Sequence, residues 1–298
     1  TTLRRLVAVL PTSAQANFLL ARAHAMTGDI KAFEERLDKA LELNPRHFSA
    51  RLALTRWQLM QGPSAASREN LAALKEQAPD NLDVLQLEAS YARRTGQEGQ
   101  ALEIYREVFE KVSNTASVIA LAQQKWRMGD KKGAMALQAQ WVAQNPKDVT
   151  GRLALAEMYG AAGKMEEAAE QYLAVLTLSE NNVIALNNLA WNLRDSELGR
   201  ALGYAEKANA LAPKSTAVMD TLAVLLGKSG ATDRAVSMNV RALSAAPDNP
   251  TLLYHRAMIL DLAGRPAEAV TVLNSLLLQS EEFPQRAEAV QMLERLRR

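Results

Sequence analysis

Apolar residues recur along the chain at spacings near i, i+3, i+4 and i+7, which is the pattern of one face of an α-helix. They fall into helix-compatible segments of roughly 13 to 15 residues. The pattern therefore predicts a long series of short amphipathic helices. Two regular series of residues separate the segments: Pro11, Pro45, Pro79, Pro146, Pro213 and Pro247, and Gly28, Gly62, Gly96, Gly129, Gly163, Gly230 and Gly264.

The two series share one period of 34 residues, and each glycine lies about half a period after a proline position. Proline cannot continue a helix, and glycine readily ends one. Each period thus predicts a helix A, a glycine turn, a helix B and a turn marked by proline. Neither helix can bury its apolar stripe alone, so neighbouring pairs must stack on one another.

The composition agrees with a helical repeat protein. The chain has 298 residues, of which 48% are hydrophobic and 5% aromatic, and its formal net charge is +2. This balance gives no strong attraction to nucleic acid or to an anionic membrane surface. The absence of cysteine excludes disulfides and thiolate chemistry from these residues. No apolar run approaches the ~18 residues that a membrane-spanning helix needs.

The period and its small residues resemble the tetratricopeptide repeat, which has 34 residues with a small residue at position 8 and alanine at position 20. The two positions meet where helices A and B of one repeat cross. Phe33 and Ser67 depart from the pattern at position 20. Position 8 is Ala21, Thr55, Ala89, Ala122, Ala156, Ala190, Ala223 and Ala257, and position 20 continues with Ala101, Ala134, Ala168, Ala201, Ala235 and Ala269. The resemblance implies an all-α, right-handed superhelix.

We expect eight repeats over residues 14–283, starting near residues 14, 48, 82, 115, 149, 183, 216 and 250. Residues 1–13 are expected to be the second helix of a truncated upstream repeat, so a targeting segment would lie further upstream. Residues 284–298 are expected to form a capping helix with Pro284 in its first turn. The sixth repeat is one residue short and lacks glycine between its helices, at residues 195–197.

The sequence holds no constellation for catalysis, for a metal or for a cofactor. In a solenoid His255 cannot reach His24 or His47, and we expect each histidine to be a packing or surface residue. There is no glycine-rich phosphate loop, no nucleophile elbow and no His-Glu helix motif. Basic pairs such as Arg93-Arg94 are scattered and offset by acidic residues, which disfavours nucleic-acid binding. We therefore expect a binding protein rather than an enzyme.

The resemblance implies that positions 5, 9 and 12 of helix A line a concave groove that holds a partner. Arginines there in the early repeats, with Asp220 and Asp261 in the late ones, lead us to expect a protein or peptide partner with an acidic portion. The aromatic residues would be flat anchors, although packing and a merely solvated face are the alternatives. The candidate partner-binding residues are Arg22, Arg56, Arg93, Trp126, Asn187, Asn188, Trp191, Arg194 and Tyr254.

Chaperone-binding members of the family combine helix-A asparagines with lysines in adjacent repeats. Here Leu153 and Asp220 occupy comparable places, so this clamp is disfavoured. Asn187 and Asn188 have two interpretations, as contacts to a bound peptide or as a family consensus pair.

The last four repeats carry a finer resemblance, in residues 185–191, 200–208, 220–222 and 283–289. They are similar to bacterial tetratricopeptide lipoproteins encoded with exosortase (PEP-CTERM) protein-sorting and exopolysaccharide systems. That similarity implies a periplasmic assembly scaffold, with a lipid anchor upstream of this sequence. The alternative is a cytosolic adaptor or co-chaperone.

Overall fold

The computed structural model describes residues 9–280 and 282–297. Within these residues it contains helices and no strand, which confirms the predicted all-α class. The chain divides into two compact units, Thr1–Gln138 and Ala139–Arg298, and the boundary lies inside α9 (Lys131–Gln144). The half-repeat predicted for residues 1–13 lies mostly outside the described residues.

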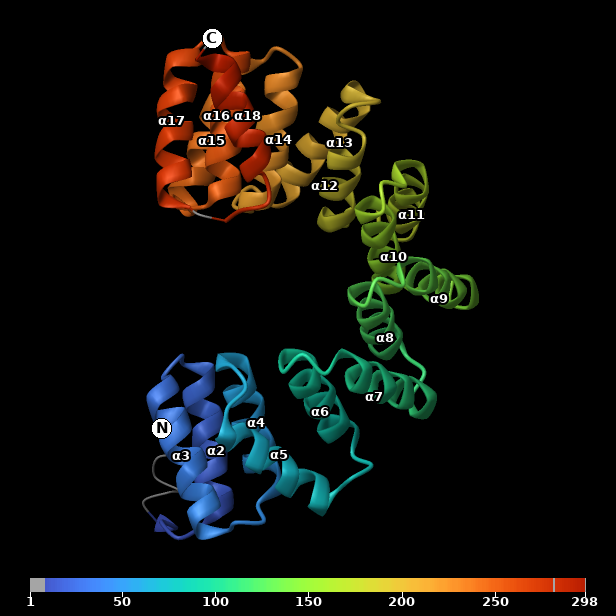
Figure 1. The fold of residues 1–298 in the computed structure, drawn as a ribbon, viewed down its shortest axis with the longest axis vertical. Coiled ribbons are helices and arrows are strands. Elements are labelled where there is room, and N and C mark those ends of the chain that lie inside the picture. Colours follow the sequence, from blue (N-terminus) through green and yellow to red (C-terminus); the bar gives the residue numbers. More distant parts are fainter. Residues whose placement is uncertain (1–8, 281, 298) are drawn as a thin grey trace. The chain divides into compact units, whose positions relative to one another are not determined.

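The first unit consists of three helix pairs and the start of a fourth (Figure 1). Successive helices from α2 to α8 pack on one another, and α4 also packs on α6. The helices are α2 (Ala14–Met26), α3 (Ile30–Leu43), α4 (Phe48–Gln61), α5 (Ala65–Gln77), α6 (Leu82–Arg94), α7 (Glu98–Lys111) and α8 (Thr115–Arg127).

The second unit repeats the same arrangement. Successive helices from α10 to α18 pack on one another, and the A helices α12, α14 and α16 pack on each other in turn. The helices are α10 (Val149–Ala161), α11 (Met165–Leu178), α12 (Val183–Asn192), α13 (Leu198–Leu211), α14 (Thr216–Lys228), α15 (Thr232–Ala245), α16 (Pro250–Leu262), α17 (Pro266–Gln279) and α18 (Arg286–Leu296).

The capping helix begins later than expected. The Arg286 amide donates to the Phe283 carbonyl, and this turn contains Pro284. The proline thus lies before α18 rather than in its first turn, because the chain must reverse direction after α17 before it can start a helix.

Polar side chains begin most of the A helices. The side chains of Ser13, Asp148 and Asn182 each accept a hydrogen bond from the backbone amide three residues later. Such caps satisfy backbone amides that have no partner within the helix. At the other end of α10, Gly163 has a φ of 76°, a conformation that other residues adopt only with strain. Caps and glycine turns together fix where each helix begins and ends.

The sixth helix pair departs from this rule because it lacks the glycine. Its helix A, α12, has 10 residues, whereas α10 and α14 have 13. The Arg194 side chain folds back, and its Nη1 donates to the Trp191 carbonyl at 2.8 Å. A side chain therefore satisfies a carbonyl at the end of this shortened helix.

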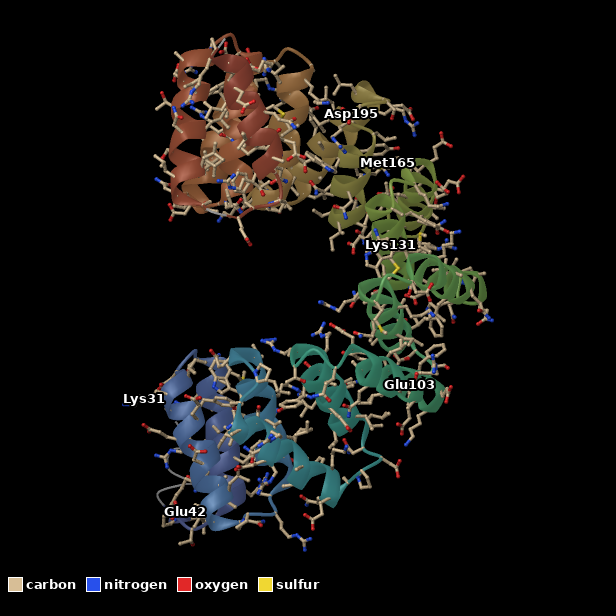
Figure 2. All side chains as sticks on the ribbon, in the orientation of Figure 1. Lys31, Glu42, Glu103, Lys131, Met165 and Asp195 are labelled. Atoms are coloured by element: carbon tan, nitrogen blue, oxygen red, sulfur yellow. The ribbon has the colours of Figure 1, made fainter. Side chains whose placement is uncertain are left out.

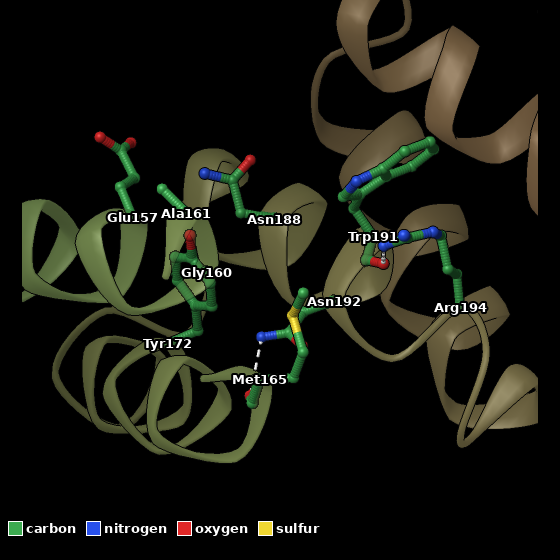
Figure 3. A pocket seen from close by; sticks show the side chains of 9 residues that line it. All are labelled: Glu157, Gly160, Ala161, Met165, Tyr172, Asn188, Trp191, Asn192 and Arg194. Carbon is green, nitrogen blue, oxygen red and sulfur yellow. Dashed lines mark hydrogen bonds between the residues drawn. The ribbon is translucent and has the colours of Figure 1, made fainter. Parts of the chain in front are cut away.

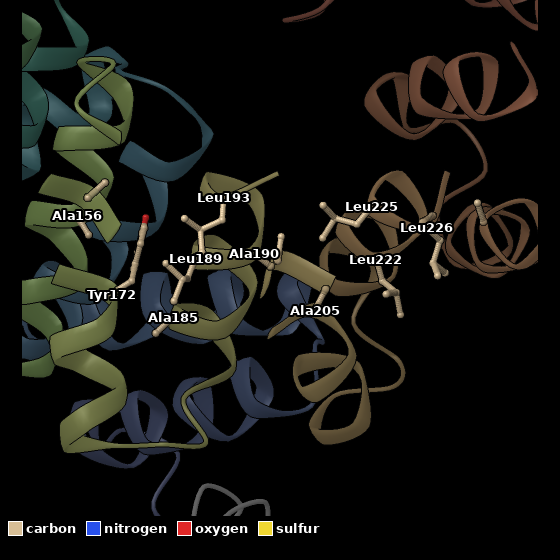
Figure 4. Close-up of a cluster of buried hydrophobic side chains, with 14 of the residues drawn as sticks. Ala156, Tyr172, Ala185, Leu189, Ala190, Leu193, Ala205, Leu222, Leu225 and Leu226 are labelled. Carbon is tan, nitrogen blue, oxygen red and sulfur yellow. The ribbon is translucent and has the colours of Figure 1, made fainter. Parts of the chain in front are cut away.

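The small residues at positions 8 and 20 all lie in the core. Ala156, Ala168, Ala190 and Ala201 have no exposed surface, and all four belong to one cluster that extends from α10 to α16 (Figure 4). Thr55 and Ser67 are also fully buried. The predicted register of the helix crossings is therefore correct.

Phe33 is the one large residue at a crossing position, and it is accommodated in the first unit. It is 8% exposed, and its ring meets Trp57 edge-on at 6.0 Å between centroids. The Trp57 indole also donates to the Glu34 carboxylate at 2.6 Å. The larger side chain thus packs against the next helix pair.

Charged side chains such as Lys31 and Glu103 project into solvent (Figure 2).

The crossing can be tested with Ala156→Phe. A phenyl ring at a fully buried contact should push α10 and α11 apart and lower the free energy of unfolding by about 1–3 kcal/mol. Denaturant unfolding followed by circular dichroism measures the change. Ala210→Phe, on the exposed end of α13, is the matched control and should be nearly neutral. Equal effects of the two variants would show that the register is wrong.

Candidate functional site

A pocket of about 300 Å³ opens in the second unit (Figure 3). It lies among α10, α11, α12 and the turn that follows α12, and we call it the α10–α12 pocket. Its walls combine charged, amide, aromatic and apolar side chains, as small binding sites do. The lining residues are Glu157, Gly160, Ala161, Met165, Tyr172, Asn188, Trp191, Asn192 and Arg194.

Helical spacing explains why these residues meet. Glu157, Gly160 and Ala161 are spaced i, i+3 and i+4 on α10, and residues 188, 191 and 192 have the same spacing on α12. Residues at this spacing share one face of a helix. Two consecutive A helices thus present equivalent faces to the pocket, while α11 contributes Met165 and Tyr172 from a helix B.

Gly160 keeps this space open. A Cβ atom there would meet no neighbouring heavy atom within 4 Å, so the glycine is not required by close packing. The open space beside the Cα atom of Gly160 is therefore part of the pocket and not of the packed core.

Hydrogen bonds order the polar wall. The Asn187 amide donates to Asn188 Oδ1 at 3.3 Å, and the Asn188 side chain hydrogen-bonds the Tyr172 phenol. Burial raises the pKa of Tyr172 to about 12, the Asn188 hydrogen bond opposes this rise, and the negative charge of Glu157 adds to it. Tyr172 therefore stays neutral across the physiological range.

Glu157 is the acidic group of the pocket. Its side chain is exposed at the rim, and partial burial of the carboxylate raises its pKa above the ordinary value. A carboxylate beside a counter-ion would show the opposite shift. Burial accounts for this shift, and no ion pair of Glu157 is found among the described residues, although Arg194 lines the same pocket.

Arg194 and Trp191 form the opposite wall. The Arg194 guanidinium carbon lies 4.5 Å from the centroid of the Trp191 ring, a stacked cation–π contact. Arg194 Nε also lies 3.3 Å from the Asp195 carboxylate. Three contacts, to a carbonyl, a ring and a carboxylate, therefore hold Arg194 in place.

Trp191 connects the pocket to the next A helices. Its ring lies 5.6 Å from that of His255, which in turn lies 5.7 Å from that of Tyr254. His255 is 4% exposed, and its Nδ1 lies 2.8 Å from the Asp220 carboxylate. The structure thus brings Trp191 and Tyr254 together through His255, which was not among the candidate partner-binding residues.

Models of the tetratricopeptide repeat match residues 14–47, 119–183 and 221–287, which together make up more than half of the chain. The chain is a tetratricopeptide repeat protein. A comparison with curated proteins found no match.

Solved structures show the same fold. A chain of the APC/C hetero-tetramer Cut9–Hcn1 is 16% identical, with a TM-score of 0.62 over 96% of this chain and 56% of that one. A tetratricopeptide repeat protein from Parabacteroides merdae is 18% identical, with a TM-score of 0.59 over 72% of this chain and 88% of that one. PilW, a type IV pilus biogenesis factor, is 21% identical, with a TM-score of 0.52 over 61% of this chain and 90% of that one. Our chain spans about half the length of the Cut9–Hcn1 chain.

Tetratricopeptide repeat proteins are generally non-enzymatic scaffolds, and nothing in the described residues points to catalysis. Those residues contain no group of three or more histidine, aspartate or glutamate side chains that could hold a metal ion. Among the same residues, none of the helices combines the length and apolarity that a bilayer span requires.

The candidate residues of the first unit lie on their own A helices. Arg22 lies over the Phe18 ring at 6.0 Å, and Lys131 lies over the Trp126 ring at 5.2 Å. Arg56 is exposed but pairs with Asp83 of the next repeat at 2.9 Å. Arg93 is half-buried. Arg56 therefore remains a predicted groove residue, and it already has a carboxylate partner on the next A helix.

The acidic residues expected at the far end of the groove also have side-chain partners. Asp220 pairs with His255, and Asp261 pairs with Arg295 of α18 at 2.6 Å. Each partner lies about one repeat later in the sequence, so repeat spacing brings the two side chains together.

The sequence analysis missed four lining residues that the structure makes prominent. Tyr172 and Met165 lie on a helix B, whereas the search was restricted to helix A. Asn192 lies at helix-A position 10, outside the positions considered. Glu157 lies at position 9, which is one of the expected groove positions, but the sequence does not show whether a carboxylate there has a counter-ion. The signal that could have found Asn192 is its i, i+4 spacing from Asn188.

A pH titration tests the environment of Glu157. In the folded chain this carboxyl holds its proton to a higher pH than in the unfolded chain, so the folded state binds more protons between the two pKa values. The free energy of unfolding should fall as the pH rises through that window. Glu157→Gln should remove this fall and be more stable than the natural chain near pH 7, with the difference vanishing below the ordinary pKa. Thermal melts across this pH range measure it. If the free energy of unfolding of the natural chain rose relative to that of Glu157→Gln as the pH increased, the raised pKa of Glu157 would be contradicted.

Proposed function

We propose that this chain is a scaffold that holds an extended segment of a partner protein along its A helices. The observation that carries the proposal is the α10–α12 pocket, whose walls come from equivalent faces of two consecutive A helices. An extended chain repeats its side chains every ~3.3 Å, so it can meet successive A helices in order. Trp191 and Tyr254 provide aromatic surface of the kind that anchors protein partners.

Site-specific photo-cross-linking tests this surface. Met165 lies at the pocket and is 43% exposed, while Leu278 on α17, a helix B, is 85% exposed. A benzoylphenylalanine at residue 165 should cross-link a discrete partner polypeptide in cells, and Trp191→Ala should reduce that product. The same group at residue 278 should give much less of it. Equal yields at the two positions would place the binding surface elsewhere.

For the cellular role, we propose a scaffold in bacterial envelope protein sorting or exopolysaccharide assembly and export, with the protein in the periplasm and lipid-anchored upstream of this sequence. The support is the similarity of residues 185–191 and 283–289 to lipoproteins of such systems. The cytosolic adaptor or co-chaperone is the second proposal, supported by Asn187 and Asn188 but not by a lysine set.

Fractionation of cells that produce the full-length protein separates the two roles. The envelope role predicts that the protein is in the periplasmic or membrane fraction. Recovery only with cytosolic markers would contradict it. Titration of the purified chain with a chaperone C-terminal peptide is the complementary measurement: saturable binding would favour the adaptor, and no binding is expected.

A further inference from the structure

Two hydrogen-bond acceptors of the α10–α12 pocket, the Glu157 carboxylate and Asn192 Oδ1, have no donor among the described residues. Within the described residues, the Glu157 carboxylate forms neither an ion pair nor a hydrogen bond. Asn192 Oδ1 is buried and has no hydrogen-bond partner, because the amide nitrogen of this side chain is used on the Met165 carbonyl at 3.0 Å. A buried acceptor left without a donor, as Asn192 Oδ1 is, costs free energy that a suitable ligand would recover.

The nearby cations cannot supply the missing donors. Arg194 is held by the Trp191 carbonyl and by Asp195. Lys164 pairs with Glu167 at 2.6 Å, and Arg152 donates to Gln171 and to the Pro146 carbonyl. Each of these side chains therefore has a partner away from Glu157.

The repeat itself explains why Glu157 is unbalanced. Asp195, Asp220 and Asp261 each have a basic partner about one repeat later, namely Lys228, His255 and Arg295. One repeat after Glu157 the chain has Trp191 and Asn192, which carry no charge. The compensation found elsewhere in this unit is therefore missing at the pocket.

The shape of the pocket selects the class of ligand. Its volume of about 300 Å³ accommodates a long side chain rather than a folded surface. Ala161, Met165 and Trp191 offer apolar surface for a methylene stem, while Glu157 lies at the exposed rim where a charged head would remain near water. A lysine ammonium has three donors and an arginine guanidinium five, whereas a carboxylate has none.

We propose that the α10–α12 pocket binds a lysine or arginine side chain of the partner segment, with Glu157 as its counter-ion. The inference rests on the proposed scaffold function and specifies the chemistry of its partner. It replaces, for this pocket, the acidic partner expected from the arginines of the early repeats.

The experiment begins with selection of dodecapeptides from a random phage-displayed library on the full chain. Selected peptides, labelled with fluorescein, are then measured by fluorescence anisotropy at low salt. We expect a basic residue at one fixed place in the selected sequences. Its replacement by glutamine should weaken binding to the natural chain by about tenfold or more, as for a charge pair at an interface.

Three variants make the test specific. Glu157→Gln should weaken the basic peptide about tenfold and make it insensitive to the lysine-to-glutamine change. Glu157→Lys should reverse the preference toward a peptide with glutamate at the same place. Glu170→Gln, an exposed acidic residue of α11 outside the pocket, is the matched control and should bind like the natural chain. Circular dichroism checks that all three variants remain folded.

The outcomes separate this inference from the scaffold function. If peptides bind but show no dependence on a basic residue, or Glu157→Gln and Glu170→Gln behave alike, the inference is wrong and the scaffold function stands. If no peptide binds and residue 165 cross-links no partner, the scaffold function itself is wrong.

Discussion

The structure depends on a steric constraint at the crossing of helices A and B. Two helices approach closely only where the contact residues are small, and each repeat supplies two such residues, as Ala156 and Ala168 do in the fifth. Close packing is sensitive to a single additional methylene. Because the crossing recurs with a fixed period, it also fixes which face of every A helix is left outside the core. Glu157 and Trp191, 34 residues apart, come to the same pocket for this reason.

Most of the fold could be predicted because the 34-residue pattern recurs in every repeat of the sequence. Prolines, glycines and small residues all report one period, so an error in any single repeat is corrected by its neighbours. Of the pocket, Asn188 and Trp191 could be predicted because they lie on helix A, and Arg194 because it occupies position 12 of the repeat, although it lies in the turn after α12. Tyr172 and Met165 could not, since the reach of a helix-B side chain depends on how tightly its own repeat is packed.

Charge balance could not be predicted from the same pattern. Asp220 with His255 and Asp261 with Arg295 are pairs about one repeat apart, and Arg56 with Asp83 is 27 residues apart. These separations differ, and each pair depends on side-chain conformations that the helical register alone does not fix. Residues that look like a charged groove in sequence are therefore partly neutralised in the structure. Glu157 differs from Asp220 and Asp261 in the residue that lies one repeat later, which is the uncharged Trp191 rather than a basic residue.

The sixth repeat shows how a local irregularity produces a site in a regular solenoid. Without glycine, α12 ends early at Asn192, and Arg194 turns back onto the Trp191 ring and carbonyl. This contact occupies the cation that lies nearest in sequence to the pocket and leaves the opposite wall to Glu157 and the amide of Asn192. A regular repeat would have continued helix A through position 12, which Arg194 occupies. The loss of one turn glycine thus directs Arg194 onto Trp191, and the tryptophan of the same repeat occupies the place where other repeats have a basic partner. Selectivity for a basic side chain would then follow from the two departures together. With a regular turn, Arg194 would be free to approach Glu157. With a basic residue in the place of Trp191, Glu157 would have a counter-ion within the chain.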